Sequence, residues 1–308
     1  MKWLLTLVFL LGSISLAAEE IFPAYSLSNT EVHQLPSQGN GRHYEVWVDL
    51  PASYLDSATD NNTKTAKRYP VLFVTDANYA FPLIRSIRNR LGAGGQNIAD
   101  FVLVGLSYAK GESPTDSRSF DYTPTDVLAK KQLKANTYGG KAYGGAALYA
   151  DYLRQQVIPF VLARYRVDPN QKVFVGHSYG GLLGAHILLT RPDTFNSYIL
   201  SSPSLWFDQG YMLQQAKQYR ATKGNFNARV QLYAAEYEQI KAGARYARTV
   251  SIVADMHQFE RILRQHQDAR LHLESQVIAD EDHLSVFPSM ISRALVKLLP
   301  GYGPYTPG

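Results

Sequence analysis

The sequence predicts an α/β fold in one domain, with a mostly parallel central sheet flanked by helices. Short apolar runs recur along the chain, and segments whose apolar residues have helical spacing lie between them. Strands that alternate with helices indicate right-handed β–α–β units, which build parallel sheets. No linker long enough to divide residues 19–301 is present, so we expect a single domain over that range.

The first predicted strand differs from the others. In residues 43–50 the apolar side chains of Tyr44, Val46, Val48 and Leu50 alternate with polar ones, among them Asp49. This alternation predicts a half-buried, antiparallel strand. The later runs are rich in β-branched and aromatic residues and are bounded by Gly, Pro, Asp or Asn. They predict strands at residues 71–75, 101–106, 172–176, 198–200, 230–234 and 271–278.

Helical spacing of apolar residues begins at Leu148 and continues to Val161, and Pro159 should kink that helix. Further helices are predicted over residues 182–190, 252–265 and 286–299, followed by a flexible tail at 302–308. Residues 109–145 contain prolines, paired glycines and tyrosines without a regular pattern. A long irregular segment in a compact domain is usually functional, so we expect it to cross the face that carries the site.

Composition excludes several classes of protein. The 308 residues include no cysteine, which excludes disulfide-stapled folds, cysteine-ligated metal centres and thiol catalysis. The net charge of +5 comes from scattered basic residues without a basic run, so we expect no nucleic-acid partner. The histidines lack the spacing of a metal site, and we expect neither a metal nor a cofactor.

Residues 1–18 have the pattern of a secretory signal peptide. Lys2 precedes an apolar run at 3–11, and the small residues Ala17 and Ala18 follow it. The run is too short for a comfortable membrane span of about 20 residues. We therefore expect cleavage near residue 18, a periplasmic or secreted mature chain, and no stable membrane insertion afterwards. Retention of the segment as an N-terminal anchor is the alternative.

Residues 176–180 read Gly-His-Ser-Tyr-Gly and fit the pattern G-x-S-x-G. A predicted strand precedes this pattern and a predicted helix follows it, which is the context of a nucleophile elbow. Glycines on both sides of Ser178 would avoid Cβ clashes in such a strained turn. Ser178 is thus the predicted nucleophile, and an ordinary glycine-rich turn is the alternative.

A serine hydroxyl needs a base, and enzymes with this elbow have the chain order serine, acid, histidine. His283 follows the last predicted strand and precedes the last predicted helix, so it is the expected base. Glu236 and Glu238 both follow the strand at 230–234, and either carboxylate could orient the imidazole. We favour Glu238, and a dyad of serine and histidine without an acid remains open.

Two backbone N–H groups are expected to bind the oxyanion that forms during ester cleavage. Tyr179, the residue after the nucleophile, should supply one of them. The loop after the strand at 71–75 should supply the other, and we favour the N–H of Asn78 over that of Tyr79.

Several motifs together resemble the putative-esterase branch of the α/β-hydrolases, and within it the siderophore esterases that hydrolyse trilactones of the enterobactin and salmochelin type. The motifs are residues 69–76 (YPVLFVTD), 118–124 (RSFDYTP), 144–165, 176–181 (GHSYGG), 191–195 (RPDTF), 201–206 (SSPSLW), 233–238 and 282–286 (DHLSV). The resemblance covers residues 30–300. It implies an α/β-hydrolase fold, Ser178 as nucleophile and His283 as base, and Glu238 as acid where relatives have one.

The expected function is a serine ester hydrolase that forms an acyl-enzyme and acts on a small-molecule ester. We expect Arg118, Tyr122 and Trp206, with Tyr138 and Tyr143, to wall a pocket for an aromatic acyl group, because aromatic faces and a cation suit a catecholate. A siderophore trilactone is the favoured substrate. A generic carboxylesterase, a feruloyl-type esterase, an acyl transferase and a non-catalytic ligand-binding scaffold are the alternatives.

Overall fold

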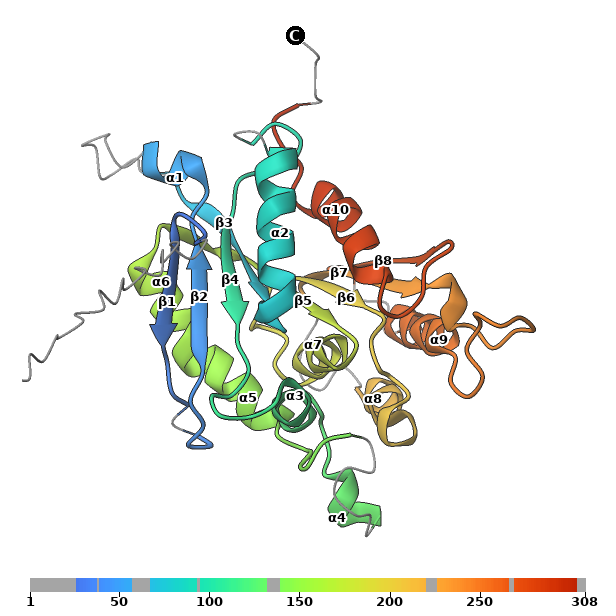
Figure 1. Cartoon of the computed structure of the whole chain (residues 1–308). Coiled ribbons are helices and arrows are strands. Elements are labelled where there is room, and N and C mark those ends of the chain that lie inside the picture. The colour runs from blue at the N-terminus through green and yellow to red at the C-terminus, as the bar shows by residue number, and fades with distance from the viewer. Residues whose placement is uncertain are drawn as a thin grey trace, which may run out of the picture.

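The structure is a computed structural model, and it describes residues 26–37, 39–56, 67–92, 95–131, 139–219, 226–265 and 269–303. An eight-stranded sheet of order β1-β2-β4-β3-β5-β6-β7-β8 runs through the molecule (Figure 1). The strands are β1 (Thr30–Gln34), β2 (Glu45–Asp49), β3 (Tyr69–Val74), β4 (Val102–Leu106), β5 (Val167–His177), β6 (Ser197–Ser201), β7 (Ala228–Ala235) and β8 (Leu271–Ile278). β2 pairs antiparallel with β1 and β4, and the remaining pairs are parallel. The predicted α/β fold with a mostly parallel sheet is confirmed.

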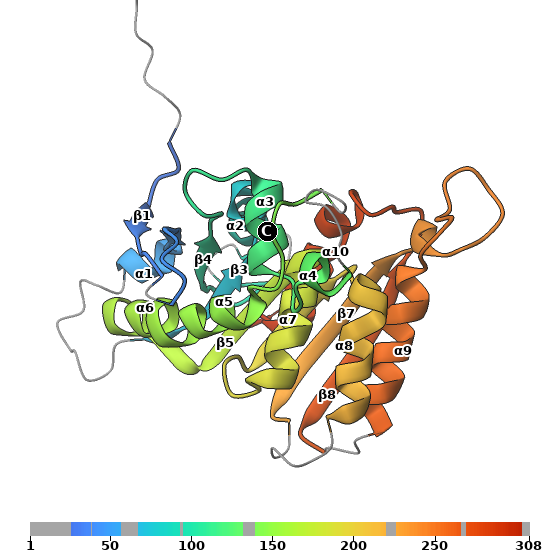
Figure 2. The same cartoon turned by 90° about the horizontal axis from the view of Figure 1, so that it is seen from below.

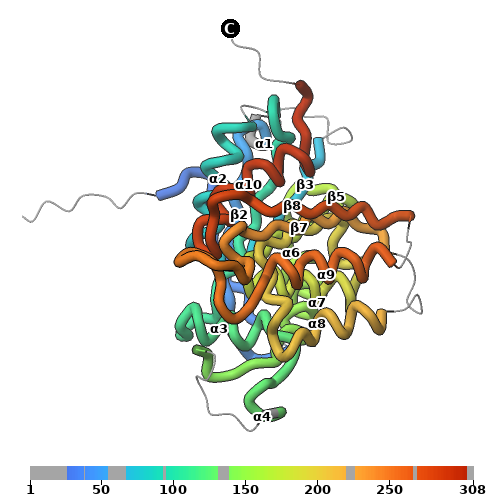
Figure 3. Tube along the Cα trace, turned by 90° about the vertical axis from the view of Figure 1, so that its right-hand side faces the viewer, coloured from blue at the N-terminus to red at the C-terminus, as the bar shows by residue number. Residues whose placement is uncertain are grey.

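Helices cover both faces of the sheet. α2 (Ala77–Gly92) and α10 (Val286–Leu298) share one hydrophobic core with the sheet, and the other core lies on the opposite face. Figures 2 and 3 show α2 and α10 on one side of the strands and α7, α8 and α9 on the other. That second layer consists of α5 (Ala146–Tyr152), α6 (Ile158–Arg164), α7 (Tyr179–Thr190), α8 (Phe207–Gln218) and α9 (Ile252–Gln265). None of the described helices has both the length and the apolar character that crossing a membrane requires.

The alternation in β2 predicted that Asp49 would lie on the exposed, polar face of the strand. This prediction is wrong, because Asp49 is fully buried. α2 covers this face and supplies two cations. Arg85 Nε donates to Asp49 Oδ2 at 2.7 Å, and Arg88 Nη2 pairs with Oδ1. A carboxylate is tolerated in such a place because it is paired and hydrogen-bonded.

The kink expected near Pro159 takes the form of a π-helical segment, Leu153–Val157, between α5 and α6. Proline lacks the N–H that an α-helix needs, and a π segment redistributes the bonds beside it. The segment 109–145 is more regular than we expected, because it contains α3 (Pro114–Asp121) and α4 (Val127–Lys131). A short helix, α1 (Ala52–Asp56), follows β2.

Tyr302 and Gly303 are held by backbone hydrogen bonds, although we expected a flexible tail to begin at residue 302. The N–H of Tyr302 donates to the carbonyl of Gly95 at 3.1 Å, and that of Gly303 donates to the carbonyl of Gln96 at 3.3 Å. Residues 304–308 and the predicted signal segment 1–18 lie outside the described residues.

His186 in α7 makes folding stability depend on pH. Burial lowers its pKa from 6.5 to about 4, so between these values the unfolded chain binds a proton that the folded chain does not. Stability therefore falls as pH falls through this window. From pH 6.5 to 5, urea denaturation should show the wild type losing about 1.6 kcal/mol more unfolding free energy than H186L. Equal losses in the two proteins would contradict this assignment.

Candidate active site

Ser178 lies in a strained turn between β5 and α7. Its φ of 58° and ψ of −116° place a non-glycine residue in a rarely adopted conformation. A Cβ added to Gly176 would lie 2.3 Å from the carbonyl oxygen of Gly180. One added to Gly180 would lie 2.3 Å from Thr75 Oγ1. The turn therefore has the geometry that the sequence predicts for a nucleophile elbow. Both positions require glycine, because neighbouring atoms leave no room for a Cβ.

His283 lies in the loop between β8 and α10, and its Nε2 is 3.0 Å from Ser178 Oγ. Asp282 shapes this loop, because its Oδ1 accepts the backbone N–H groups of Leu284 at 3.0 Å and Ser285 at 3.1 Å. The distance between hydroxyl and imidazole is one over which a proton can pass directly.

Glu238 meets the other nitrogen of the imidazole. Its Oε1 lies 2.5 Å from His283 Nδ1. Its Oε2 accepts the hydroxyl of Ser202 and the N–H of Ala235, each at 2.7 Å. The side chain is only 4% exposed, so this carboxylate is fixed by protein donors. The geometry is that of a serine, histidine and carboxylate triad.

Glu236 points elsewhere because residues Glu236–Glu238 form a 3-10 turn rather than extended chain. Glu236 Oε1 accepts the hydroxyl of Tyr246 at 2.9 Å, and Oε2 accepts the N–H of Asp280 at 3.1 Å. Glu236 therefore ties together the loops beside the site and does not touch His283.

His177 packs beneath His283, with 4.7 Å between the ring centroids. Its Nδ1 lies 3.0 Å from Ser201 Oγ. Burial, followed by the neighbouring His283, lowers the pKa of His177 to about 3. His177 is therefore neutral at ordinary pH, so it supports the His283 ring without repelling a positive charge on it.

The two residues predicted to bind an oxyanion lie at the same edge of the sheet. Tyr179 is the first residue of α7 and Asn78 is the second of α2. These helices leave the carboxyl ends of β5 and β3, which are parallel neighbours. The N–H of Tyr79, our alternative donor, bonds to the carbonyl of Asp76 at 3.2 Å.

A cavity of about 650 Å³ opens above Ser178 and His283. Arg118 and Trp206 line it, as we predicted, together with Tyr179. The prediction for Tyr122 is wrong, because this side chain is 1% exposed and packs in the core, 5.6 Å between ring centroids from Tyr149.

Tyr143 is likewise buried, and its ring stacks on that of Phe207. Both tyrosines therefore pack in the core, where aromatic rings contact one another, and do not line the cavity. Tyr138 lies outside the described residues.

The sequence did not indicate several residues of the site. Ser204 Oγ lies 3.3 Å from Ser178 Oγ, and Tyr237 and Arg245 line the cavity. Ser204 lies within a motif, residues 201–206, but nothing in the sequence distinguishes it from its neighbouring serines. Tyr237 and Arg245 reach the site only because the chain after β7 turns back over it. Within the described part of the chain, no group of three or more His, Asp or Glu side chains could hold a metal ion.

Comparisons with known proteins find relatives over most of the chain. The ferri-bacillibactin esterase BesA of Bacillus subtilis (strain 168) is 25% identical over 286 residues, which cover 92% of this chain and 93% of that protein. The siderophore triacetylfusarinine C esterase of Aspergillus fumigatus is 29% identical over 291 residues, covering 87% of this chain and 92% of that one.

The fold also matches solved structures. The crystal structure of the BES protein from Bacillus cereus has a TM-score of 0.74 at 22% identity, covering 91% of this chain and 99% of that chain. The arrangement is thus of the α/β-hydrolase type, as the motifs implied. A family profile described as Putative esterase matches residues 37–266, well over half of the sequence. The chain therefore belongs to the Putative esterase family and is an ester hydrolase.

Proposed function

We propose that the chain hydrolyses esters through an acyl-enzyme on Ser178, with His283 as base and Glu238 as the acid that orients it. The observation that carries this proposal is the continuous contact from Ser178 Oγ to His283 Nε2, at 3.0 Å, and from His283 Nδ1 to Glu238 Oε1, at 2.5 Å. This contact lies at the base of a cavity large enough for a small-molecule ester.

The reaction follows from these contacts. Ser178 Oγ attacks the ester carbonyl while its proton passes to His283 Nε2, and the N–H groups of Tyr179 and Asn78 receive the oxyanion. The intermediate expels the alcohol, which takes the proton from His283, and the acyl group stays on Ser178. Water then attacks the acyl-enzyme with His283 again as base, which releases the acid and restores the serine. A lost oxyanion donor costs about 2.7–4 kcal/mol of barrier in comparable sites.

We further propose that the substrates are siderophores whose backbone contains ester bonds. Aromatic rings of Tyr179, Trp206 and Tyr237 line the cavity beside the cation of Arg245. Such a surface suits the aromatic, anionic groups that chelate iron in catecholate siderophores. The names of the relatives, ferri-bacillibactin esterase and siderophore triacetylfusarinine C esterase, support siderophores as the substrates.

The experiment is a panel of esters followed by mass spectrometry. A catecholate trilactone, with and without iron, should first be opened to a linear product that is heavier by one water. Its kcat/KM should exceed those of p-nitrophenyl acetate and methyl ferulate by at least about tenfold, the factor that 1.4 kcal/mol of added binding provides. Efficient cleavage of the simple esters with an intact trilactone would favour a generic carboxylesterase or feruloyl-type esterase instead.

Export remains our prediction from the sequence of residues 1–18. A periplasmic or secreted location would place the enzyme where a siderophore arrives from outside the cell. This prediction requires neither disulfides nor oxidative folding, because the chain has no cysteine.

A further inference from the structure

Arg118 on α3 connects the ends of two strands. Its Nε donates to Asp76 Oδ1 at 3.1 Å, and its Nη2 donates to Asp76 Oδ2 at 3.4 Å and to the carbonyl oxygen of His177 at 3.4 Å. The guanidinium carbon also lies 5.5 Å from the centre of the Tyr179 ring. One side chain therefore touches Asp76, the second residue after β3, and His177, the residue that precedes Ser178.

The charge of Arg118 is already balanced inside the protein. The Asp76 side chain is fully buried, whereas that of Arg118 is 24% exposed. Burial disfavours the Arg118 cation, but the adjacent Asp76 carboxylate and the neighbouring tyrosines together outweigh this effect and raise the pKa of the guanidinium. An anionic substrate would have to compete with a desolvated carboxylate for this cation. That competition makes Arg118 a poor substrate ligand, contrary to its sequence-based interpretation.

The two strand ends that Arg118 connects are the ones that carry the proposed oxyanion donors. Asp76 has a left-handed φ of 56° and lies two residues before Asn78. His177 lies two residues before Tyr179. An oxyanion hole works only when both donors lie about 2.7–3.1 Å from the developing charge. The two donors come from different strands, so a bridge between the strand ends controls their separation.

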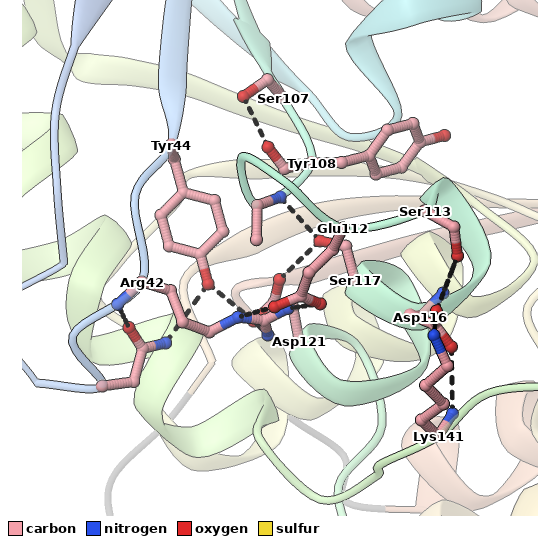
Figure 4. Close-up of polar contacts among 12 residues, drawn as sticks. Arg42, Tyr44, Ser107, Tyr108, Glu112, Ser113, Asp116, Ser117, Asp121 and Lys141 are labelled. Atoms are coloured by element: carbon pink, nitrogen blue, oxygen red, sulfur yellow. Dashed lines mark hydrogen bonds and ion pairs between the residues drawn. The ribbon is translucent and has the colours of Figure 1, made fainter.

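The helix α3, which carries Arg118, is held in place through Asp121 (Figure 4). Asp121, three residues further along this helix, accepts the hydroxyls of Tyr44 at 2.7 Å and Ser117 at 3.0 Å, and Arg42 Nη1 lies 2.5 Å from it. Arg42 also pairs with Glu112. The Asp121 side chain is 1% exposed, so the segment before β2 and α3 are joined by a buried polar network. The position of Arg118 is thus set by the protein before any substrate binds.

We infer that Arg118 is a positioning residue that fixes the spacing of the two oxyanion donors, and that it does not bind the substrate. The inference rests on the proposed roles of Tyr179 and Asn78. It predicts that a change at Arg118 acts on the transition state, where the oxyanion exists, and leaves binding of the neutral ester unchanged.

The test is R118K with p-nitrophenyl acetate. Lysine keeps a positive charge beside Asp76, but a single ammonium cannot reproduce the planar fork that reaches both Asp76 and His177. We expect kcat to fall about 10- to 100-fold, because a misplacement of about 1 Å can cost 100-fold. KM should stay within about twofold, since uniform binding is not lost. The inhibition constant of a trifluoromethyl ketone, which forms an oxyanion on the serine, should rise by the same factor as kcat falls.

The controls separate positioning from folding. R154K changes an exposed arginine that pairs with Asp193 at 2.6 Å, and it should keep the wild-type kcat. The double variant D76N/R118Q removes the bridge without leaving a buried charge unpaired, and it should show the same loss of kcat with a cooperative thermal transition. If R118K raised KM and left kcat unchanged, Arg118 would be a substrate ligand and the inference would be wrong. Unchanged kcat and inhibition constant would overturn it as well.

Failure of the proposed catalytic site gives a different result. In that case S178A would keep its turnover whatever the behaviour of R118K. Loss of turnover in S178A together with wild-type kinetics in R118K would leave the proposed function standing and reject the role of Arg118.

Discussion

Replacement of Ser178 by alanine is expected to lower kcat for p-nitrophenyl acetate by at least about 10⁴-fold. Without Oγ no acyl-enzyme forms, and the oxyanion donors alone retain only a small part of the rate. Alanine has the same Cβ as serine and meets the same strain at φ 58°, so the turn itself should persist. The measurement is steady-state hydrolysis at saturating ester, with enzyme concentration raised until the residual rate exceeds the blank.

The matched control is S275A. The Ser275 hydroxyl lies on β8 and donates to Glu260 at 2.6 Å, so its loss removes a hydrogen bond without touching the site. Both variants should unfold cooperatively within a few degrees of the wild type. Retention of a tenth or more of the wild-type rate by S178A would remove Ser178 as the nucleophile and favour a different site or a scaffold without catalysis.

The second large effect is expected for E238Q, which should lower kcat by about 10³- to 10⁴-fold. Oε2 of Glu238 accepts two donors, and one of them, the N–H of Ala235, cannot reverse its role. The carbonyl oxygen of a glutamine would therefore occupy the Oε2 position, and its NH₂ group would face His283. An imidazole that accepts at Nδ1 carries its proton on Nε2, which is the wrong tautomer to receive the proton of Ser178.

E236Q is the matched control for this result. Glu236 lies two residues away and bonds to Tyr246 and to the backbone of Asp280. Its amide variant should change kcat by less than about threefold. The pair of variants also decides between a triad and a dyad: a small effect of E238Q, similar to that of E236Q, would show that His283 works without an acid.

The parts of the fold that follow from hydrophobic pattern were predictable. The buried runs after β2 correspond to six parallel strands, and the bounds of α9 match the predicted helix. Ser178 and His283 were predictable because each follows a strand that ends at the same edge of a parallel sheet. The family profile ends at residue 266, so the position of His283 rests on this argument and on the structure.

Other features depend on tertiary contacts that the pattern does not contain. The choice between Glu236 and Glu238 is made by a 3-10 turn three residues long, which separates two side chains that an extended chain would place on the same side. α2 escaped prediction because Pro82 lies inside it and argues against a helix. α8 contains Asp208, Gln209 and Gly210 with positive φ near its start.

The burial of individual tyrosines also depends on tertiary contacts that the sequence pattern does not contain. The sequence shows that the segment 109–145 is rich in tyrosine, but not which rings face the cavity. Tyr122 became a core residue because its neighbour in space, Tyr149, comes from α5 rather than from the segment itself. Arg118 does reach the cavity, and its contacts with Asp76 could not be inferred because the partner lies 42 positions earlier in the chain.

The most direct test is covalent labelling of the wild-type protein with a fluorophosphonate, followed by intact-mass measurement and peptide mapping. The reagent reacts with a serine only where a base has activated it. The proposed site predicts one adduct per chain, located on Ser178, and a labelling rate that falls by at least about 100-fold in H283A. A folded protein that takes up no label, or one that carries the adduct on another serine, would contradict the assignment of Ser178 and His283 as the working pair.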